Sequence, residues 1–199
     1  MIRYILLTCC LLLTANFTYG EERSDSTIRH VLENKGIEFT DNNTVALLMN
    51  GYEKFDDMFE AIRQARNHVH LEYFNFRNDS IASALFDILK QKVKEGVKVR
   101  ALFDGFGNDS NNSPLKKKHL DSLRASGIEI YEFDPIRFPW INHVFSRDHR
   151  KIVVIDGAVA YTGGMNVADY YLKGTEQVGE WRDMHCRIEG GTVDELQRI

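Results

Sequence analysis

Short apolar runs alternate with amphipathic stretches through the first two thirds of the chain. Apolar residues at every second position predict strands, whereas apolar residues three and four positions apart predict helices. The predicted strands cover residues 44–49, 68–76, 97–103 and 128–133, and the predicted helices cover residues 54–65, 80–95 and 115–126. Strands that alternate with helices of this length indicate an α/β fold, with a mostly parallel or mixed β-sheet that helices cover on both faces.

A wholly apolar run over residues 152–155 follows this region. Such a run is typical of a buried strand, and the Asp156-Gly157 pair after it is typical of a tight turn. A second strand is predicted over residues 158–162, and it ends at the Gly163-Gly164 pair. The pattern therefore predicts two strands joined by a turn, with glycines at the far end.

The N-terminal segment has a different composition from the rest. A basic residue precedes an apolar run, and small residues stand before Glu21, which is typical of a cleaved secretory signal peptide over residues 1–20. The run is shorter than the roughly 20 residues that span a bilayer, so an uncleaved N-terminal membrane anchor is the second interpretation. Residues 21–43 are interpreted as a surface lead-in with one short helix over residues 28–34, and residues 44–199 as the domain proper.

Composition narrows the function classes. The chain has 199 residues, a net charge of -4 and 43% hydrophobic residues, which fits one globular domain with its own core. An acidic balance argues against a surface built to neutralise nucleic-acid phosphates, so any anion site must be local. Cys186 is the single cysteine outside the N-terminal segment, and we interpret it as a strand residue.

His149, Lys151 and Asp156 carry the candidate chemistry, in the spacing His-x-Lys-x4-Asp. Strand alternation places His149 and Lys151 on one face. A histidine ring can attack phosphorus when a carboxylate holds its second nitrogen, and a neighbouring lysine can neutralise the phosphate oxygens. Each residue alone has an ordinary structural interpretation, namely a satisfied histidine, an edge lysine and a turn aspartate. The joint pattern favours a catalytic site.

Gly163, Gly164 and Asn166 complete the pattern after the second predicted strand. Glycines permit close approach to the backbone, and the Asn166 side chain supplies an amide donor. We therefore predict that these three residues bind the substrate phosphate.

The spacing of His149, Lys151 and Asp156 resembles the motif of the phospholipase D superfamily, and the wider chain resembles bacterial cardiolipin synthases. The wider resemblance extends from Val45 to the end of the chain, and its most specific segments are residues 71–77, 96–107 and 181–190. It implies a phospholipase D-like half-domain and metal-independent chemistry without a cofactor.

The resemblance also implies residue roles. His149 would be the nucleophile that forms a phosphatidyl-histidine intermediate, Lys151 a phosphate ligand, and Asp156 part of the supporting network. Glu72 and Asp104 would lie near the site at strand positions, where a structural role is as good an interpretation as a catalytic one.

The reaction implied by the resemblance needs a second histidine to protonate the leaving oxygen, and this chain holds one copy of the motif. Either two copies of the chain each supply one histidine, or the chain is the front half of a longer enzyme. Residues 190–199 resemble a helix that has barely begun, which favours a C-terminally truncated chain. A second motif-bearing half is therefore an expected partner.

The resemblance implies a phosphatidyltransferase that makes cardiolipin from two phosphatidylglycerol molecules. The alternatives are a phospholipase D-type hydrolase, a secreted single-motif nuclease that acts as a dimer, and an inactive phosphate-binding half-domain. Phosphatidylglycerol and a membrane surface are the expected partners, and nucleic acid is not. The aromatic loop over residues 133–141 is typical of a membrane interface or of core packing, and the N-terminal segment indicates a membrane-associated or exported protein.

Overall fold

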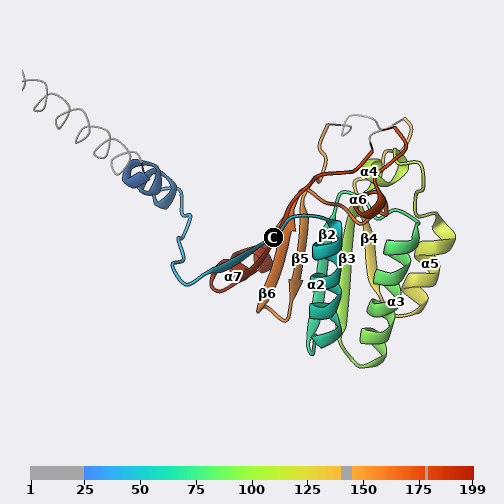
Figure 1. Cartoon of the computed structure of the whole chain (residues 1–199), viewed down its shortest axis with the longest axis horizontal. Coiled ribbons are helices and arrows are strands. Elements are labelled where there is room, and N and C mark those ends of the chain that lie inside the picture. Colours follow the sequence, from blue (N-terminus) through green and yellow to red (C-terminus); the bar gives the residue numbers. More distant parts are fainter. Residues whose placement is uncertain (1–24, 140–144, 178) are drawn as a thin grey trace, which may run out of the picture. The chain divides into compact units, whose positions relative to one another are not determined.

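The computed structural model describes residues 25–139, 145–177 and 179–199. The chain divides into two compact units, Met1–Asp41 and Asn42–Ile199. The second unit contains the whole sheet and all of the candidate site residues (Figure 1).

The described part of the first unit is one helix and the segment that follows it. The helix covers residues 25–33, and Gly36 follows with a φ of 79°. The helix predicted over residues 28–34 is therefore confirmed, with an earlier start. The signal or anchor predicted over residues 1–20 lies outside the described residues.

A seven-stranded mixed sheet organises the second unit, in the order β1-β7-β6-β5-β2-β3-β4. The α/β class with a mixed sheet flanked by helices is confirmed. The strands are β1 (Thr44–Leu48), β2 (His68–Tyr73), β3 (Lys98–Asp104), β4 (Glu129–Phe133), β5 (Lys151–Ile155), β6 (Val159–Gly163) and β7 (His185–Glu189).

The parallel part of the sheet is confined to β2, β3 and β4, and every other pairing is antiparallel. Antiparallel pairing begins between β2 and β5, and a tight turn then sends β6 back along β5. Asp156 and Gly157 occupy this turn with φ of 54° and 65°, the left-handed conformation that short hairpin turns require. The number of parallel strand pairs in the sheet is therefore smaller than the sequence pattern predicts.

Side-chain caps explain where the three helices α2, α3 and α4 begin. Asn50 accepts a hydrogen bond from the backbone N–H of Glu53, Asp79 from that of Ala82, and Asp104 from that of Gly107. The cap of Asp104 forms a short helix inside a segment that the sequence predicts as a loop. The helices of this unit are α2 (Gly51–Gln64), α3 (Ser80–Lys94), α4 (Gly105–Asp109), α5 (Lys117–Ala125), α6 (Tyr170–Lys173) and α7 (Thr192–Arg198).

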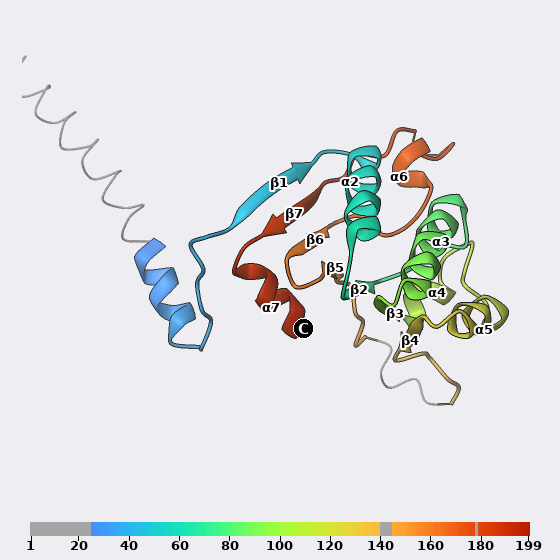
Figure 2. The same cartoon turned by 90° about the horizontal axis from the view of Figure 1, so that it is seen from below.

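Helices α2, α3 and α5 cover one face of the sheet, and α7 lies on the other face (Figure 2). Val69, Leu71 and Tyr73 of β2 are buried towards α2 and α3, as their alternation predicts. On the opposite face α7 packs against β5, β6 and β7, and β2, β3 and β4 leave a cavity there. Among the described residues, helices therefore flank both faces of the sheet, and the second face is covered at β5, β6 and β7 but not at β2, β3 and β4.

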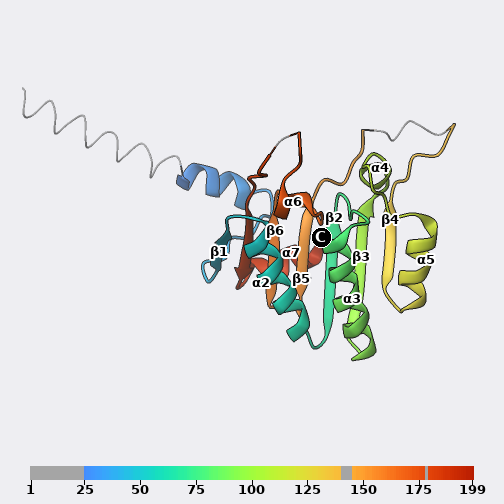
Figure 3. The ribbon, with the colours of Figure 1, turned by 45° about the vertical axis from the view of Figure 1, so that its right-hand side comes forward.

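Most of the candidate residues, but not Asp156, gather where β2, β3 and β4 end. Tyr73, at the end of β2, pairs with Lys151 at the start of β5, and Gly163, at the end of β6, pairs with His185 at the start of β7. Figure 3 shows α4, α6 and the segments that lead into β5 and β7 at this end of the sheet. Ligands of open α/β sheets bind at the carboxyl ends of parallel strands, and the fold provides such an end here.

Among the described residues, no helix combines the length and the apolar character needed to cross a membrane.

Candidate active site

Lys151 is a nearly buried lysine at the start of β5, with 4% of its surface exposed. Its ammonium donates a hydrogen bond of 2.6 Å to the backbone carbonyl of His149 and lies 5.3 Å from the centroid of the Phe74 ring. Burial lowers the pKa of Lys151 to about 8, although Asp148 and Asp183 raise it. The structure therefore brings Lys151 and His149 together, as the sequence predicts, and leaves the ammonium charged at neutral pH.

The His149 ring is exposed to solvent beside this ammonium. Its centroid lies 4.7 Å from that of the Phe74 ring, which limits how the imidazole can turn. Partial burial lowers the pKa of His149, Lys151 lowers it further, and Asp104 and Asp148 partly offset both effects. A neutral imidazole has a lone pair on one ring nitrogen, so the ring can act as a nucleophile at neutral pH.

Asp104 anchors the segment that carries His149. Its carboxylate is fully buried and accepts hydrogen bonds from the backbone N–H of Asp148 at 2.8 Å and of Gly107 at 2.9 Å. The Arg147 guanidinium lies 3.3 Å from the same carboxylate and 2.8 Å from that of Asp134. Asp104 therefore determines where the chain enters the motif.

Glu72 and Asp148 form a carboxyl pair next to the motif, and Arg150 bridges them. The Arg150 guanidinium lies 2.9 Å from the Glu72 carboxyl and 3.2 Å from that of Asp148. Burial raises the pKa of Glu72 to about 7, and a hydrogen bond with Asp148 and the charge of Asp148 contribute to the shift. The two carboxyl groups therefore titrate together, and the raised pKa of Glu72 and the lowered pKa of Asp148 favour Glu72 as the group that takes up a proton.

Gly163 and Gly164 leave room for two side chains of this chain. A Cβ atom at Gly163 would lie 2.6 Å from Nδ1 of His185, and one at Gly164 would lie 2.2 Å from a carboxylate oxygen of Asp183. In the structure His185 and Asp183 make the close approach to these glycines, and phosphate binding by Gly163 and Gly164 stays a prediction.

Asn166 follows the glycines and is 6% exposed. Its side-chain oxygen accepts a hydrogen bond of 3.3 Å from the backbone N–H of Asn75, and its amide donates to the Tyr171 hydroxyl at 3.4 Å. The predicted phosphate-binding amide is thus oriented towards the interior, where it ties the end of β2 to α6.

Asp156 does not lie with His149 and Lys151. It follows the last residue of β5, five residues beyond Lys151, which places it roughly 16 Å away along an extended strand. Its carboxylate accepts backbone hydrogen bonds of 2.7, 2.7 and 2.8 Å from Arg66, Asn67 and His68. Burial would raise the pKa of Asp156, but these hydrogen bonds lower it below the usual value. The strand therefore separates Asp156 from His149 and Lys151, and the expected place of Asp156 in the supporting network of the site stays a prediction.

Sequence reasoning did not identify Lys54, Asp183 and His185, which lie behind the Gly163-Gly164 turn. Lys54 and His185 are fully buried, and the charges of Lys54 and Lys151 both act on His185. A lysine in an amphipathic helix is usually a solvent-exposed residue, so its sequence position gives no signal. Asp183 and His185 could have been found because they lie at the start of β7, in one of the segments that carry the family resemblance.

Comparison with known proteins identifies the family of the chain. Residues 58–178, more than half of the chain, match the family model described as cardiolipin synthase, PLD-like domain. The chain is 42% identical over 160 residues to cardiolipin synthase 1 of Bacillus cereus, and the aligned region covers 80% of this chain and 31% of that protein. It is 42% identical over 181 residues to cardiolipin synthase of Halalkalibacterium halodurans, and the aligned region covers 90% of this chain and 35% of that protein. The chain therefore spans about a third of the length of the curated relatives it matches.

Solved structures with a similar fold include two proteins with low sequence identity. Phosphatidylserine synthase of Haemophilus influenzae superposes with a TM-score of 0.62 and 18% identity, and the match covers 77% of this chain and 35% of that one. A phospholipase D family member, Nuc from Salmonella typhimurium, superposes with a TM-score of 0.52 and 16% identity, covering 79% of this chain and 89% of that one. These structures show a shared fold. Because the family model matches more than half of the chain, the chain belongs to the cardiolipin synthase, PLD-like domain family.

Proposed function

We propose that the chain supplies the nucleophilic half of a phospholipase D-type phosphatidyltransferase, which makes cardiolipin from two phosphatidylglycerol molecules. The observation that carries the proposal is the exposed His149 ring beside the ammonium of Lys151. An uncharged imidazole next to a buried cation combines a nucleophile with a group that attracts phosphate oxygens. The similarity to cardiolipin synthases supports the choice of a phospholipid as substrate.

The reaction proceeds in two displacements at phosphorus. A ring nitrogen of His149 attacks the phosphodiester of the first phosphatidylglycerol, the bond from phosphorus to the glycerol headgroup breaks, and the glycerol oxygen takes up a proton. The headgroup hydroxyl of the second phosphatidylglycerol then attacks the phosphatidyl-histidine and loses its proton, and the nitrogen–phosphorus bond breaks. Lys151 donates hydrogen bonds to the non-bridging oxygens while negative charge accumulates on them. Gly163, Gly164 and Asn166 support the site by shaping the turn beside it.

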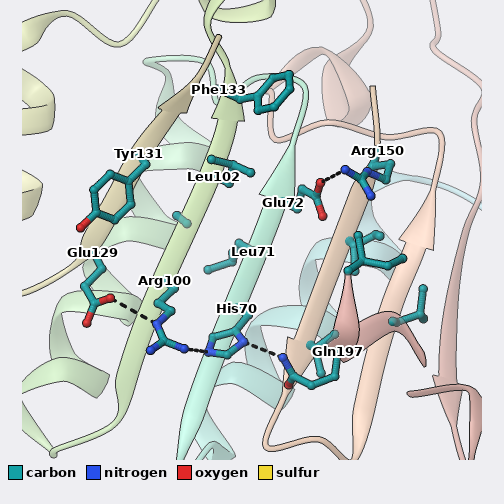
Figure 4. Close-up of a pocket in the computed structure, with 15 residues that line it drawn as sticks. His70, Leu71, Glu72, Arg100, Leu102, Glu129, Tyr131, Phe133, Arg150 and Gln197 are labelled. Carbon is teal, nitrogen blue, oxygen red and sulfur yellow. Dashed lines mark hydrogen bonds and ion pairs between the residues drawn. The ribbon is translucent and has the colours of Figure 1, made fainter. Parts of the chain in front are cut away.

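The proton for the leaving glycerol comes, in this proposal, from the histidine of a second motif-bearing half. The uncovered face of the sheet supports such a partner. A cavity of about 530 Å³ lies on this face, with Arg100 and Arg150 among apolar side chains such as Leu102 and Tyr131 (Figure 4). A mixed surface of this kind resembles an interface between domains. The second half belongs either to the same polypeptide or to a second copy of the chain.

We further propose that the protein acts at a membrane surface, because its substrate is a bilayer lipid. Phe138 and Phe145, in the segment that leads into the motif, are 91% and 96% exposed, and the exposed Arg137 precedes Phe138. Aromatic rings beside a basic residue favour the boundary between headgroups and acyl chains. This segment and the predicted N-terminal signal or anchor support a membrane-associated or exported location.

Product analysis tests the proposed reaction. The chain is incubated with phosphatidylglycerol vesicles in chelator, alone and with added purified second half, and lipids are identified by mass spectrometry. His149→Ala is the matched variant, and light scattering gives the oligomeric state. Cardiolipin formation that requires His149 supports the transferase. Phosphatidic acid without cardiolipin would instead assign a phospholipase D-type hydrolase, in which water replaces the second lipid. Equal products from His149→Ala would reject both.

A further inference from the structure

Helix α2 carries a lysine that is fully buried beneath the candidate site. Lys54 is 0% exposed, and its ammonium donates hydrogen bonds to the backbone carbonyls of Met165 at 3.3 Å and Asn166 at 3.0 Å. The same nitrogen lies 4.2 Å from the centroid of the Phe55 ring and 5.1 Å from that of Tyr73. Lysines are almost never fully buried unless a partner compensates the charge, so this position calls for an explanation.

The two carbonyls belong to the turn that follows β6 and contains both site glycines. The backbone N–H of Gly164 donates to the carbonyl of Met184 at 3.1 Å, which ties one side of the turn to the start of β7. Lys54 ties the other side of the turn to α2. The ammonium therefore fixes the turn on the side of α2, and the Gly164 hydrogen bond fixes it on the side of β7.

Lys54 also lies behind the sheet row that contains Lys151. Thr162 pairs with Ile152, so Gly163 stands opposite Lys151, and Gly163 pairs with His185 on its other side. Paired residues point to the same face of a sheet, and in this row that face is the one covered by α2. Burial and the charges of Lys54 and Lys151 together lower the pKa of His185 to about 2. Two amines and an imidazole thus share one buried environment.

A second buried lysine, Lys92, has its charge compensated by an ion pair. Lys92 of α3 is 6% exposed and also donates to a backbone carbonyl, that of Arg63, at 2.8 Å. Its ammonium is paired with the Glu95 carboxylate at 2.6 Å. Among the described residues, Lys54 has no carboxylate within ion-pair distance. Its charge is therefore not neutralised by a direct ion pair, and Asp183 acts on it from beyond that distance.

We propose that Lys54 is a positioning residue of the phosphate site, which holds the Gly163–Asn166 turn through two backbone carbonyls and strengthens anion binding at Lys151. The inference rests on the proposed function, because it takes the natural anion to be a phosphodiester. Burial lowers the pKa of Lys54 well below its usual range, with Asp183 opposing the shift and Lys151 adding to it. An anion near Lys151 favours the protonated amine, so anion binding and protonation of Lys54 reinforce each other.

Sulfate is the probe, because it has the tetrahedral shape of phosphate and its charge stays constant over the pH range of the experiment. Its affinity for the 199-residue chain is measured by calorimetry across a pH series for the parent, Lys54→Met, Lys92→Met and Lys151→Met. Methionine keeps most of the buried volume of lysine and removes the charge. We expect Lys54→Met to weaken sulfate binding by about tenfold, equivalent to about 1.4 kcal/mol, and Lys92→Met to change it less than about twofold.

The pH series distinguishes a role of Lys54 in positioning the turn and supplying charge from a general loss of protein stability in the variant. The decline of sulfate affinity with rising pH becomes shallower in Lys54→Met, because one group that takes up a proton is missing, and stays unchanged in Lys92→Met. The amide resonance of Gly164 shifts in Lys54→Met and not in Lys92→Met. Equal sulfate affinity and an equal pH profile in the two variants, measured on folded protein, would overturn the role of Lys54 alone. Sulfate binding that is absent, or insensitive to Lys151→Met, would overturn the phosphate site and the inference with it.

Discussion

Asp156 accepts a hydrogen bond from the backbone N–H of His68. Asp156 lies just after β5, at the end of the strand that is remote from Lys151. One strand thus carries two parts of the same motif to opposite ends of the sheet. Lys151 reaches the candidate site, whereas Asp156 holds the beginning of β2 beside the turn into β6. The motif spacing therefore reflects the length of a strand as well as the chemistry at one of its ends.

Replacing the Asp156 carboxylate therefore reduces stability and leaves the chemistry of each folded molecule intact. We expect Asp156→Asn to lower the free energy of unfolding by about 1–3 kcal/mol, because hydrogen bonds to a charged group are stronger than neutral ones. Urea unfolding at neutral pH measures the change, and Asp87→Asn, on an exposed residue of α3, is the control. A fully stable Asp156→Asn protein that had lost its phosphodiester chemistry would contradict this role.

The effect of Asp156→Asn depends on pH in a defined direction. The folded-state pKa of Asp156 lies below the unfolded value, so its contribution is complete above the unfolded pKa and is lost as pH falls through the folded pKa. The difference between parent and variant therefore shrinks in acid. A difference that grew as pH fell would have the wrong sign.

Gly163→Ala tests the close contact between the turn and β7. A Cβ atom would lie 2.6 Å from Nδ1 of His185 and 2.7 Å from the backbone oxygen of Met184, and the φ of 156° lies in the region that favours glycine. We expect a loss of about 2–4 kcal/mol, since steric overlap adds to backbone strain. Gly157→Ala is the matched control, because its φ is 65° and nothing lies within 4 Å of its Cβ position. Thermal unfolding compares them, and equal losses in the two variants would contradict the contact.

Much of this arrangement follows from the sequence, and the exceptions have physical causes. The apolar run of β5 and the Asp156-Gly157 turn predict the β5–β6 hairpin, because local alternation and turn chemistry determine both. The placement of β5 against β2 is not predictable in this way, since strand partners are chosen by contacts between distant segments. Lys54 was missed for a similar reason, because its burial depends on a turn more than a hundred residues away.

Anion binding should weaken in alkali because Lys151 loses its proton. Its pKa of about 8 means that the ammonium is charged below that pH and uncharged above it. The affinity for dimethyl phosphate, whose single charge is constant, should therefore fall as pH rises through about 8. In Lys151→Arg the fall should move to higher pH, because a guanidinium remains protonated. Nuclear magnetic resonance titration measures both affinities, and an affinity that is flat across this range in the parent would contradict the assignment.

Glu72→Gln should change how stability depends on pH. Glu72 has a folded pKa of about 7, above the unfolded value, so its contribution is complete below the unfolded pKa and is lost as pH rises through the folded pKa. The parent should therefore lose stability between about pH 5 and 7, and Glu72→Gln should flatten this decline, since an amide does not titrate. Urea midpoints across pH test this, with Glu60→Gln, an exposed residue of α2, as the control. An unchanged slope in Glu72→Gln would contradict a proton shared with Asp148.

The covalent intermediate tests the central claim most directly. The chain is mixed with short-chain phosphatidylglycerol, and the second motif-bearing half is added if it is a separate molecule. The reaction is quenched in alkali, because nitrogen–phosphorus bonds are labile to acid. Peptide mass spectrometry then locates the phosphatidyl group. We predict that it resides on His149, disappears in His149→Ala and persists in Asp156→Asn. A phosphatidyl group on another residue, or turnover to cardiolipin that continues in His149→Ala, would contradict the account.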